Sequence, residues 1–218
     1  MSQRAGMTTD RIVAAALDEL DDSGLDALTM RRVATRLGVQ LNTVYWHATG
    51  KPALLDLMAD ALLTGCDRPP LPPAWPDRLR VIATRLHDAL LSRRDGARLL
   101  EVAHPDGPRW HSLIESLAGA ATTAGLDRTG AATAARLVVH AVTGMVRDHG
   151  LGRTTVDDVR LTFALDVLVD GIAARVPASA AQRADDDLAR RLRPPPPATR
   201  RPRGSGRPPP PARPATED

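Results

Sequence analysis

The chain has 218 residues, with 29 basic and 26 acidic side chains, a formal net charge of +3 and a pI of 9.9. Only 2% of its residues are aromatic and it has one cysteine, which argues against a strand-rich fold and excludes an internal disulfide or a cysteine-rich metal centre. No apolar run approaches the roughly 18 residues of a membrane helix, and the first residues show no apolar signal-peptide region. We therefore expect a cytoplasmic protein with no membrane partner.

The distribution of proline divides the chain into blocks. No proline lies in residues 1–51 or 109–176, whereas five lie in 68–76 and ten in the last 25 residues. Since proline interrupts helices, the proline-free blocks are where helices can run. The expected fold is all-α, with about nine or ten helices. Its predicted parts are a first helical block at 1–65 that includes a connecting helix at 50–65, a proline-rich linker at 66–76, a second helical block at 77–176 and a tail at 177–218.

The tail explains most of the high pI. Residues 177–218 hold nine arginines and five acids, a net of +4, so the rest of the chain has a net charge of −1. A segment so rich in Pro, Arg and Gly and so poor in apolar residues is expected to be disordered. It could be a non-specific nucleic-acid arm, a ligand for a proline-binding domain, or a low-complexity extension without a role.

Three helices are predicted in the first 51 residues, a longer one followed by two short ones. Apolar residues at helical spacing predict helices over 9–22, 30–37 and about 41–47. Thr29 is the expected N-cap of the second helix, and Gly38 is expected to end it. Two short helices joined by a tight turn after a longer helix are typical of a helix-turn-helix. In the first helix, Asp18, Glu19 and Asp21 are expected on the solvent face.

Charge supports a nucleic-acid-binding interpretation of this block. Residues 29–51 contain Arg31, Arg32, Arg36 and Lys51 and no acid, while 8–28 contain six acids and one arginine. A positive face of this kind is the footprint of a phosphate-binding surface. The alternative is a structural three-helix bundle with a solvated basic face.

At residues 9–63 the sequence resembles a known family. The stretch LGVQLNTVYWHATGKPALL is similar to the DNA-binding domain of the TetR family of repressors, and YWH followed by a lysine and ALLD resembles its tetracycline repressor branch. RRDGARLL at 93–100, followed by Pro105, resembles the second domain of that branch. The resemblance implies a ligand-responsive transcriptional regulator, a repressor that binds a palindromic double-stranded operator as a homodimer.

The expected DNA contacts lie on the second, third and fourth helices. Leu41, Asn42 and Thr43 open the third helix and are expected to reach base edges, because asparagine pairs with adenine and methyl groups contact the thymine methyl. Trp46 is expected to pack within the domain. Contacts to the phosphate backbone are expected from Thr29, Arg31, Tyr45, His47 and Lys51, of which Arg31 could also reach a guanine edge.

Four longer helices are predicted in the second block, over 77–93, 108–124, 128–149 and 155–176. The last one has two apolar stripes, and a helix with two apolar faces must bury both. One face can pack on its own domain, so the other suggests a homodimer in which the last two long helices of each chain form a four-helix bundle. One stripe is formed by Val156, Val159, Phe163 and Val167 and the other by Leu161, Leu165, Leu168 and Ile172, and either can be the one that faces the partner.

The resemblance also bears on the effector. In the tetracycline repressor, the positions of Leu100 and Ala103 hold a magnesium-binding histidine and a threonine, so no metal or other cofactor is expected here. We expect a small, largely apolar effector instead, with His104, His140 or Asp148 as polar anchors; each apolar position could equally be ordinary core. The expected ligand-binding residues are Ile82, Leu86, Leu100, Ala103, His104, Leu117, Val139, Val142 and Asp148.

The sequence leaves two alternative functions. A protein that coats nucleic acid non-specifically would depend on the arginine-rich tail. An all-helical enzyme would use Asp148 with His104 or His140 as acid and base, but the sequence contains no nucleophile–base motif, no GxGxxG and no metal-binding cluster. We therefore expect no enzymatic activity.

Overall fold

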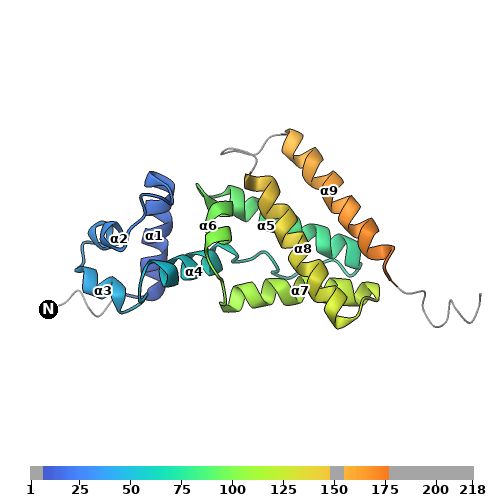
Figure 1. Ribbon diagram of the computed structural model, residues 1–218, viewed down its shortest axis with the longest axis horizontal. Coiled ribbons are helices and arrows are strands. Elements are labelled where there is room, and N and C mark those ends of the chain that lie inside the picture. The colour runs from blue at the N-terminus through green and yellow to red at the C-terminus, as the bar shows by residue number, and fades with distance from the viewer. Residues whose placement is uncertain (1–6, 148–154, 177–218) are drawn as a thin grey trace, which may run out of the picture. The chain divides into compact units, whose positions relative to one another are not determined.

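The prediction of an all-α chain is confirmed. The computed structural model describes residues 7–147 and 155–176, and this part of the chain forms nine helices and no strand (Figure 1). The predicted tail, 177–218, lies outside the described residues. The helices are α1 (Thr9–Ser23), α2 (Met30–Leu37), α3 (Leu41–Tyr45), α4 (Lys51–Leu62), α5 (Trp75–Leu91), α6 (Gly96–Val102), α7 (Pro108–Ala124), α8 (Arg128–Arg147) and α9 (Thr155–Ala173).

The helix-turn-helix unit (α1–α3) is delimited by the predicted caps. Thr29 accepts a hydrogen bond from the backbone N–H of Arg32, as an N-cap residue does. Gly38 ends α2 in the left-handed conformation, with φ 65°, which a residue with a Cβ adopts only at a cost. Helix α3 is shorter than the predicted 41–47 and is anchored by Val44, which is fully buried. The turn between α2 and α3 is therefore set largely by local chemistry.

Helix α4 connects the helix-turn-helix unit to the second block. It begins at Lys51 and ends at Leu62, within the predicted 50–65, and packs against α1, α6 and α7. Asp60 of α4 is buried and accepts hydrogen bonds from the backbone N–H groups of Arg109 (3.0 Å) and Trp110 (3.1 Å) in the first turn of α7. The first N–H groups of a helix have no partner within it, so Asp60 caps α7 and holds α4 against it.

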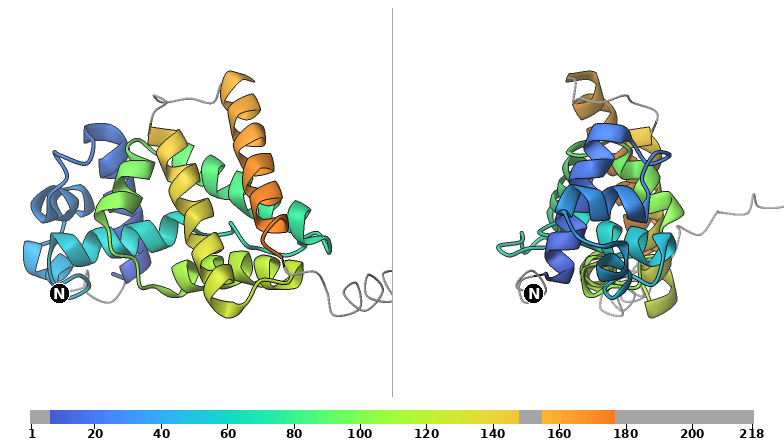
Figure 2. Two further views of the ribbon diagram at one scale, coloured as in Figure 1. Left: turned by 45° about the vertical axis from the view of Figure 1, so that its right-hand side comes forward. Right: turned by 90° about the vertical axis from the view of Figure 1, so that its left-hand side faces the viewer.

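Helices α5 to α8 enclose the core of the second block, and α9 packs against α5, α7 and α8 (Figure 2). The inward face of α9 buries Leu161, Leu165, Val169 and Ile172. All nine helices lie in one compact unit. Within the part of the chain that the structure covers, no helix is both long and apolar enough to cross a membrane.

One helix was not predicted. Helix α6 spans Gly96–Val102 and follows Asp95, which has a positive φ of 56°. The turn before it contacts the end of α1 and the α1–α2 loop: Asp95 accepts a hydrogen bond from the N–H of Leu25 (2.9 Å), and Arg98 of α6 forms an ion pair with Asp26 (2.6 Å). Helix α6 is thus held by contacts with residues about 70 positions earlier in the sequence.

Candidate DNA-binding surface and ligand-binding core

The start of α3 presents its side chains to solvent. Leu41 is 37% exposed, Asn42 is exposed and Thr43 is half-buried, while Val44 on the opposite side is anchored in the core. One turn later Tyr45 is 44% exposed. Together these side chains form one accessible edge of the helix-turn-helix unit.

The expectation for Trp46 is wrong. This side chain is 87% exposed, so it does not pack within the domain. Its backbone continues the turn of α3 with helical angles, and its N–H donates to the carbonyl of Asn42. The indole therefore extends the accessible surface of Tyr45 by a large apolar group with one hydrogen-bond donor.

Two of the expected phosphate contacts are tied to other parts of the molecule. His47 lies just after α3, and its Nδ1 is 3.0 Å from the hydroxyl of Thr9 at the start of α1. Lys51 is the first residue of α4 and donates from Nζ to the backbone carbonyl of Leu25, 3.3 Å away. Both side chains are half-buried, so their positions are constrained before any ligand binds.

Two of the arginines on α2 form ion pairs with acidic residues of α1, which the sequence did not predict. Glu19 was expected on the solvent face of α1, but it is 4% exposed and pairs with Arg32 (2.5 Å) and Arg36 (2.9 Å). Arg36 also pairs with Asp22. The hydrogen bond from Arg32, followed by that from Ser23, holds the pKa of the Glu19 carboxyl at about 2. Arg32 and Arg36 are thus engaged by acidic side chains of α1. Of the predicted basic residues on α2, the exposed Arg31 is the one that can bind a phosphate of another molecule.

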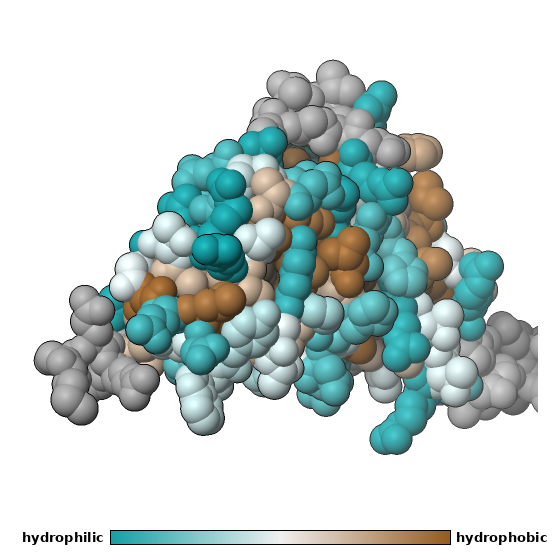
Figure 3. Space-filling view, turned by 60° about the vertical axis from the view of Figure 1, so that its left-hand side comes forward, coloured by the Kyte–Doolittle hydropathy of each residue, from teal (hydrophilic) through white to brown (hydrophobic). Residues whose placement is uncertain are grey.

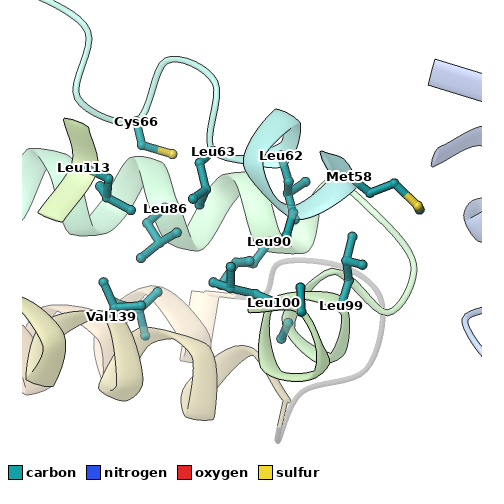
Figure 4. Close-up of a cluster of buried hydrophobic side chains, with 14 of the residues drawn as sticks. Met58, Leu62, Leu63, Cys66, Leu86, Leu90, Leu99, Leu100, Leu113 and Val139 are labelled. Carbon is teal, nitrogen blue, oxygen red and sulfur yellow. The ribbon is translucent and has the colours of Figure 1, made fainter. Parts of the chain in front are cut away.

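The apolar residues expected to bind a ligand lie together. Leu86 of α5, Leu100 at the end of α6 and Val139 of α8 point into one cluster, which also contains Leu113 and Cys66 (Figure 4). Burial raises the pKa of the Cys66 thiol to about 11. We call this set the central core. The predicted members, all buried, are Ile82, Leu86, Leu100, Ala103, Leu117, Val139 and Val142.

Two of the three expected polar anchors, His104 and His140, are not part of the central core. His104 is exposed, and its backbone N–H donates to Asp56 of α4 at 2.8 Å. His140 is exposed as well, and Asp148 lies outside the described residues. Among the described histidines of the second block, His87 is buried: it is 3% exposed and has Nδ1 3.4 Å from a carboxylate oxygen of Asp88. His87 lies four residues after Ala83 and next to Leu86, on the apolar stripe of α5. This position in the sequence could have predicted that its side chain is buried.

The residues at the two magnesium-related positions do not suit that metal. Leu100 and Ala103 are buried and apolar, and neither offers an oxygen or nitrogen donor from its side chain. Magnesium requires an ordered set of oxygen ligands. The chemistry of these residues therefore does not fit an effector that binds as a magnesium chelate.

A cavity of about 500 Å³ lies elsewhere, between the α5–α6 turn and the end of α8. Its walls include Leu90 and Val102, and the guanidinium groups on it are paired: Arg98 with Asp26, and Arg147 with Glu101 at 3.0 Å. None of the predicted ligand-binding residues lines it. The predicted apolar ligand-binding residues are thus buried and lie apart from this cavity.

An apolar strip remains on the outer surface of α8 and α9. Leu137 is 54% exposed, Val159 65%, Phe163 70% and Val167 54%. The three residues of α9 follow one another at intervals of four, so they share one face of the helix. Figure 3 shows a face of the molecule on which apolar side chains interrupt the hydrophilic surface.

Two family models match the chain. The model for bacterial regulatory proteins of the tetR family matches residues 12–58, and the model for the tetracyclin repressor-like C-terminal domain matches residues 69–157. The class A tetracycline repressor protein from transposon 1721 of Escherichia coli is 39% identical over 109 residues. That alignment covers 49% of this chain and 50% of the relative, so the chain spans about half the length of this curated relative.

Solved structures match over a longer range. BioQ of Mycobacterium smegmatis is 34% identical with a TM-score of 0.70, over 77% of this chain and 98% of BioQ. BioQ has also been solved with its double-stranded DNA operator, and that structure matches at 35% identity with a TM-score of 0.68 over 78% of this chain and 99% of that one. ActR of Streptomyces coelicolor in complex with actinorhodin is 26% identical with a TM-score of 0.72, over 81% of this chain and all of ActR. With its helix-turn-helix unit, its second helical block and these matches, the chain belongs to the tetR family of bacterial regulatory proteins.

Proposed function

We propose that this protein is a ligand-responsive transcriptional repressor that binds a palindromic operator as a homodimer and is released by a small, largely apolar effector. The observation that carries the proposal is the exposed edge of α3, from Leu41 to Trp46, on a compact helix-turn-helix unit joined through α4 to a separate apolar block. Relatives support both parts, because BioQ has been solved with operator DNA and ActR with actinorhodin.

In this proposal, the start of α3 reads bases and its surroundings hold the DNA backbone. Asn42 is exposed where it can pair with an adenine edge, and Leu41 and Thr43 offer methyl groups to thymine. Trp46 adds an exposed indole beside them. The backbone contacts are assigned to Thr29, Arg31, Tyr45, His47 and Lys51.

In this proposal, release of the protein from its operator depends on the contacts of α4 with the helices on either side of it. This helix packs against α1 on one side and against α6 and α7 on the other. An effector that enters the central core must displace side chains of α5 to α8, and a shift of α6 or α7 is passed to α4 through its contacts with them. In a dimer the two α3 helices must match half-sites about one helical turn apart, so a small pivot lowers operator affinity.

The proposal is tested with purified full-length protein and random-sequence DNA. We expect selection of a palindromic site, and binding whose affinity falls steeply with salt. The selected site should recur near the protein's own gene. Absence of any sequence-selective binding would contradict the proposal. A variant that lacks 177–218 separates it from the tail-driven alternative: a sequence-specific regulator keeps its selectivity, whereas a coating protein loses most of its binding.

Base reading by Asn42 has its own test. Asn42→Ala should relax the preference at one base pair of each half-site, at a cost of about 1–3 kcal/mol, because a bidentate pair to adenine is lost. Tyr45→Ala is the matched comparison on the same helix, and it should weaken binding to all sequences alike. The measurement is operator selection repeated with each variant. An unchanged selection profile for Asn42→Ala would show that this side chain does not read the operator.

A further inference from the structure

A hydrogen bond joins the first residue of α1 to the turn after α3. The hydroxyl oxygen of Thr9 lies 3.0 Å from Nδ1 of His47, across 38 residues of sequence. The backbone of His47 is itself fixed, since its N–H and that of Ala48 both reach the carbonyl of Val44 at 3.0 Å. Nothing in the described part of the chain binds the other ring nitrogen, Nε2.

The chemistry of imidazole gives this contact a consequence. A neutral imidazole carries its proton on one nitrogen, and the hydrogen bond at the other nitrogen decides which. A threonine hydroxyl can donate to Nδ1, and the proton then resides on Nε2. Phosphate oxygens only accept hydrogen bonds, so a histidine that contacts the DNA backbone must present an N–H to it.

We infer that Thr9 is a positioning residue for DNA binding: its hydroxyl donates to Nδ1 of His47 and so directs the Nε2–H of that ring toward a phosphate. The inference rests on the proposed function, in which His47 contacts the DNA backbone. Thr9 suits the role because α1 is capped by Thr8, which accepts a hydrogen bond from the N–H of Arg11. The hydroxyl of Thr9 is therefore not required as a cap, and its β-branched side chain has few rotamers.

The prediction concerns the affinity for the operator at a fixed salt concentration. Thr9→Val keeps the shape of the side chain but removes the hydroxyl, so His47 loses its orientation. We expect about a tenfold weaker operator affinity for each helix-turn-helix unit, as for a lost hydrogen bond to a charged group. The slope of log K against log salt should stay as in the wild type, because a neutral imidazole that donates to a phosphate carries no charge and releases no counterion. Thr9→Ser keeps a hydroxyl and should behave like the wild type.

A double-mutant cycle separates orientation from packing. His47→Ala should lower the operator affinity at least as much as Thr9→Val, and the double variant should be no weaker than His47→Ala alone, because Thr9 acts only through that ring. Additive losses, or a Thr9→Val variant with the operator affinity of the wild type, would overturn the inference. If His47→Ala itself leaves the affinity unchanged, the phosphate contact assigned to His47 under the proposed function fails first.

A measurement on the free protein keeps the inference testable if Thr9→Val folds poorly. Nitrogen-15 NMR of the histidine rings, at about pH 9 where an imidazole is neutral, distinguishes the two tautomers. The signal lost in His47→Ala identifies the ring. We expect the Nε2–H tautomer in the wild type and in Thr9→Ser. The Nδ1–H tautomer in the wild type would overturn the inference.

Discussion

The burial of Glu19 changes how the charged residues of α1 and α2 are interpreted. In the sequence it is one of several acids on α1, and the arginines of α2 look free for phosphate. In the structure its carboxylate is buried between Arg32 and Arg36 and also accepts a hydrogen bond from the hydroxyl of Ser23 (2.8 Å). These partners are brought together by the packing of α1 on α2, which no local pattern encodes. The caps Thr29 and Gly38 could be predicted because they depend on their immediate neighbours alone.

The stability of the helix-turn-helix unit should depend on the ionised form of Glu19. Folding lowers the pKa of this carboxyl from 4.5 to about 2, with the hydrogen bond from Arg32 as the largest cause. Its contribution is therefore complete above about pH 5 and is lost as the pH falls toward 2. Glu19→Gln should reduce the free energy of unfolding by roughly 2 kcal/mol at pH 7, a value discounted for the exposure of Arg32.

Denaturant unfolding of both proteins from pH 7 to pH 2 checks this prediction. The difference between Glu19→Gln and the wild type should shrink steadily below about pH 4.5. Glu115→Gln, at an exposed position of α7, is the control and should have little effect at any pH. A difference for Glu19→Gln that does not vary with pH would mean that its charge is not what stabilises the unit.

The length of a helix and the spacing of its apolar residues decide whether the helix can be predicted from the sequence. Helices α5, α7 and α8 are 17 to 20 residues long, and their apolar stripes predicted them closely. Helix α6 has seven residues, too few for a periodic pattern to stand out, and it lies between two predicted helices. It exists because Asp95 and Arg98 bind the α1–α2 loop and because α4 and α8 pack on it.

The junction between α4 and α7 should depend on Asp60. Its buried carboxylate accepts two backbone N–H groups and pairs with the guanidinium of Arg109 at 3.1 Å. Asp60→Asn keeps the shape and one acceptor but removes the charge, so we expect a loss of about 1–3 kcal/mol in the free energy of unfolding. Asp56→Asn, which alters a single exposed hydrogen bond one turn earlier, should cost less. Urea unfolding compares them, and an equal loss would argue against the capping role.

At the scale of the whole molecule, the sequence predicted the second apolar face of α9 but not the state of the predicted pocket. Two stripes on one helix are visible in the sequence, and one of them is indeed exposed at Val159, Phe163 and Val167. An apolar pocket wall and an apolar core, in contrast, have the same composition and spacing. Only the packing of α5 to α8 shows that Leu86 and Leu100 are in contact with other side chains of the core.

The proposed homodimer can be tested at this strip. Phe163→Asp places a charge at the most exposed apolar position of α9, where burial against a second copy would require its desolvation. We expect sedimentation to show a shift from dimer to monomer, together with a loss of operator binding. Thr122→Asp, at an exposed position of α7, should leave the dimer intact. A Phe163→Asp variant that stays dimeric would place the interface elsewhere.

The burial of the central core has a consequence for the sensitivity of the proposed regulator. If an effector can enter only molecules whose core has opened, its apparent affinity is its intrinsic affinity multiplied by the fraction of open molecules; at 1% open, the apparent affinity is about a hundredfold lower. The leucines that keep the core closed also stabilise the fold. Under the proposed function, the burial of Leu86 and Leu100 therefore sets a concentration threshold for the effector, and this threshold and the stability of the protein rise together.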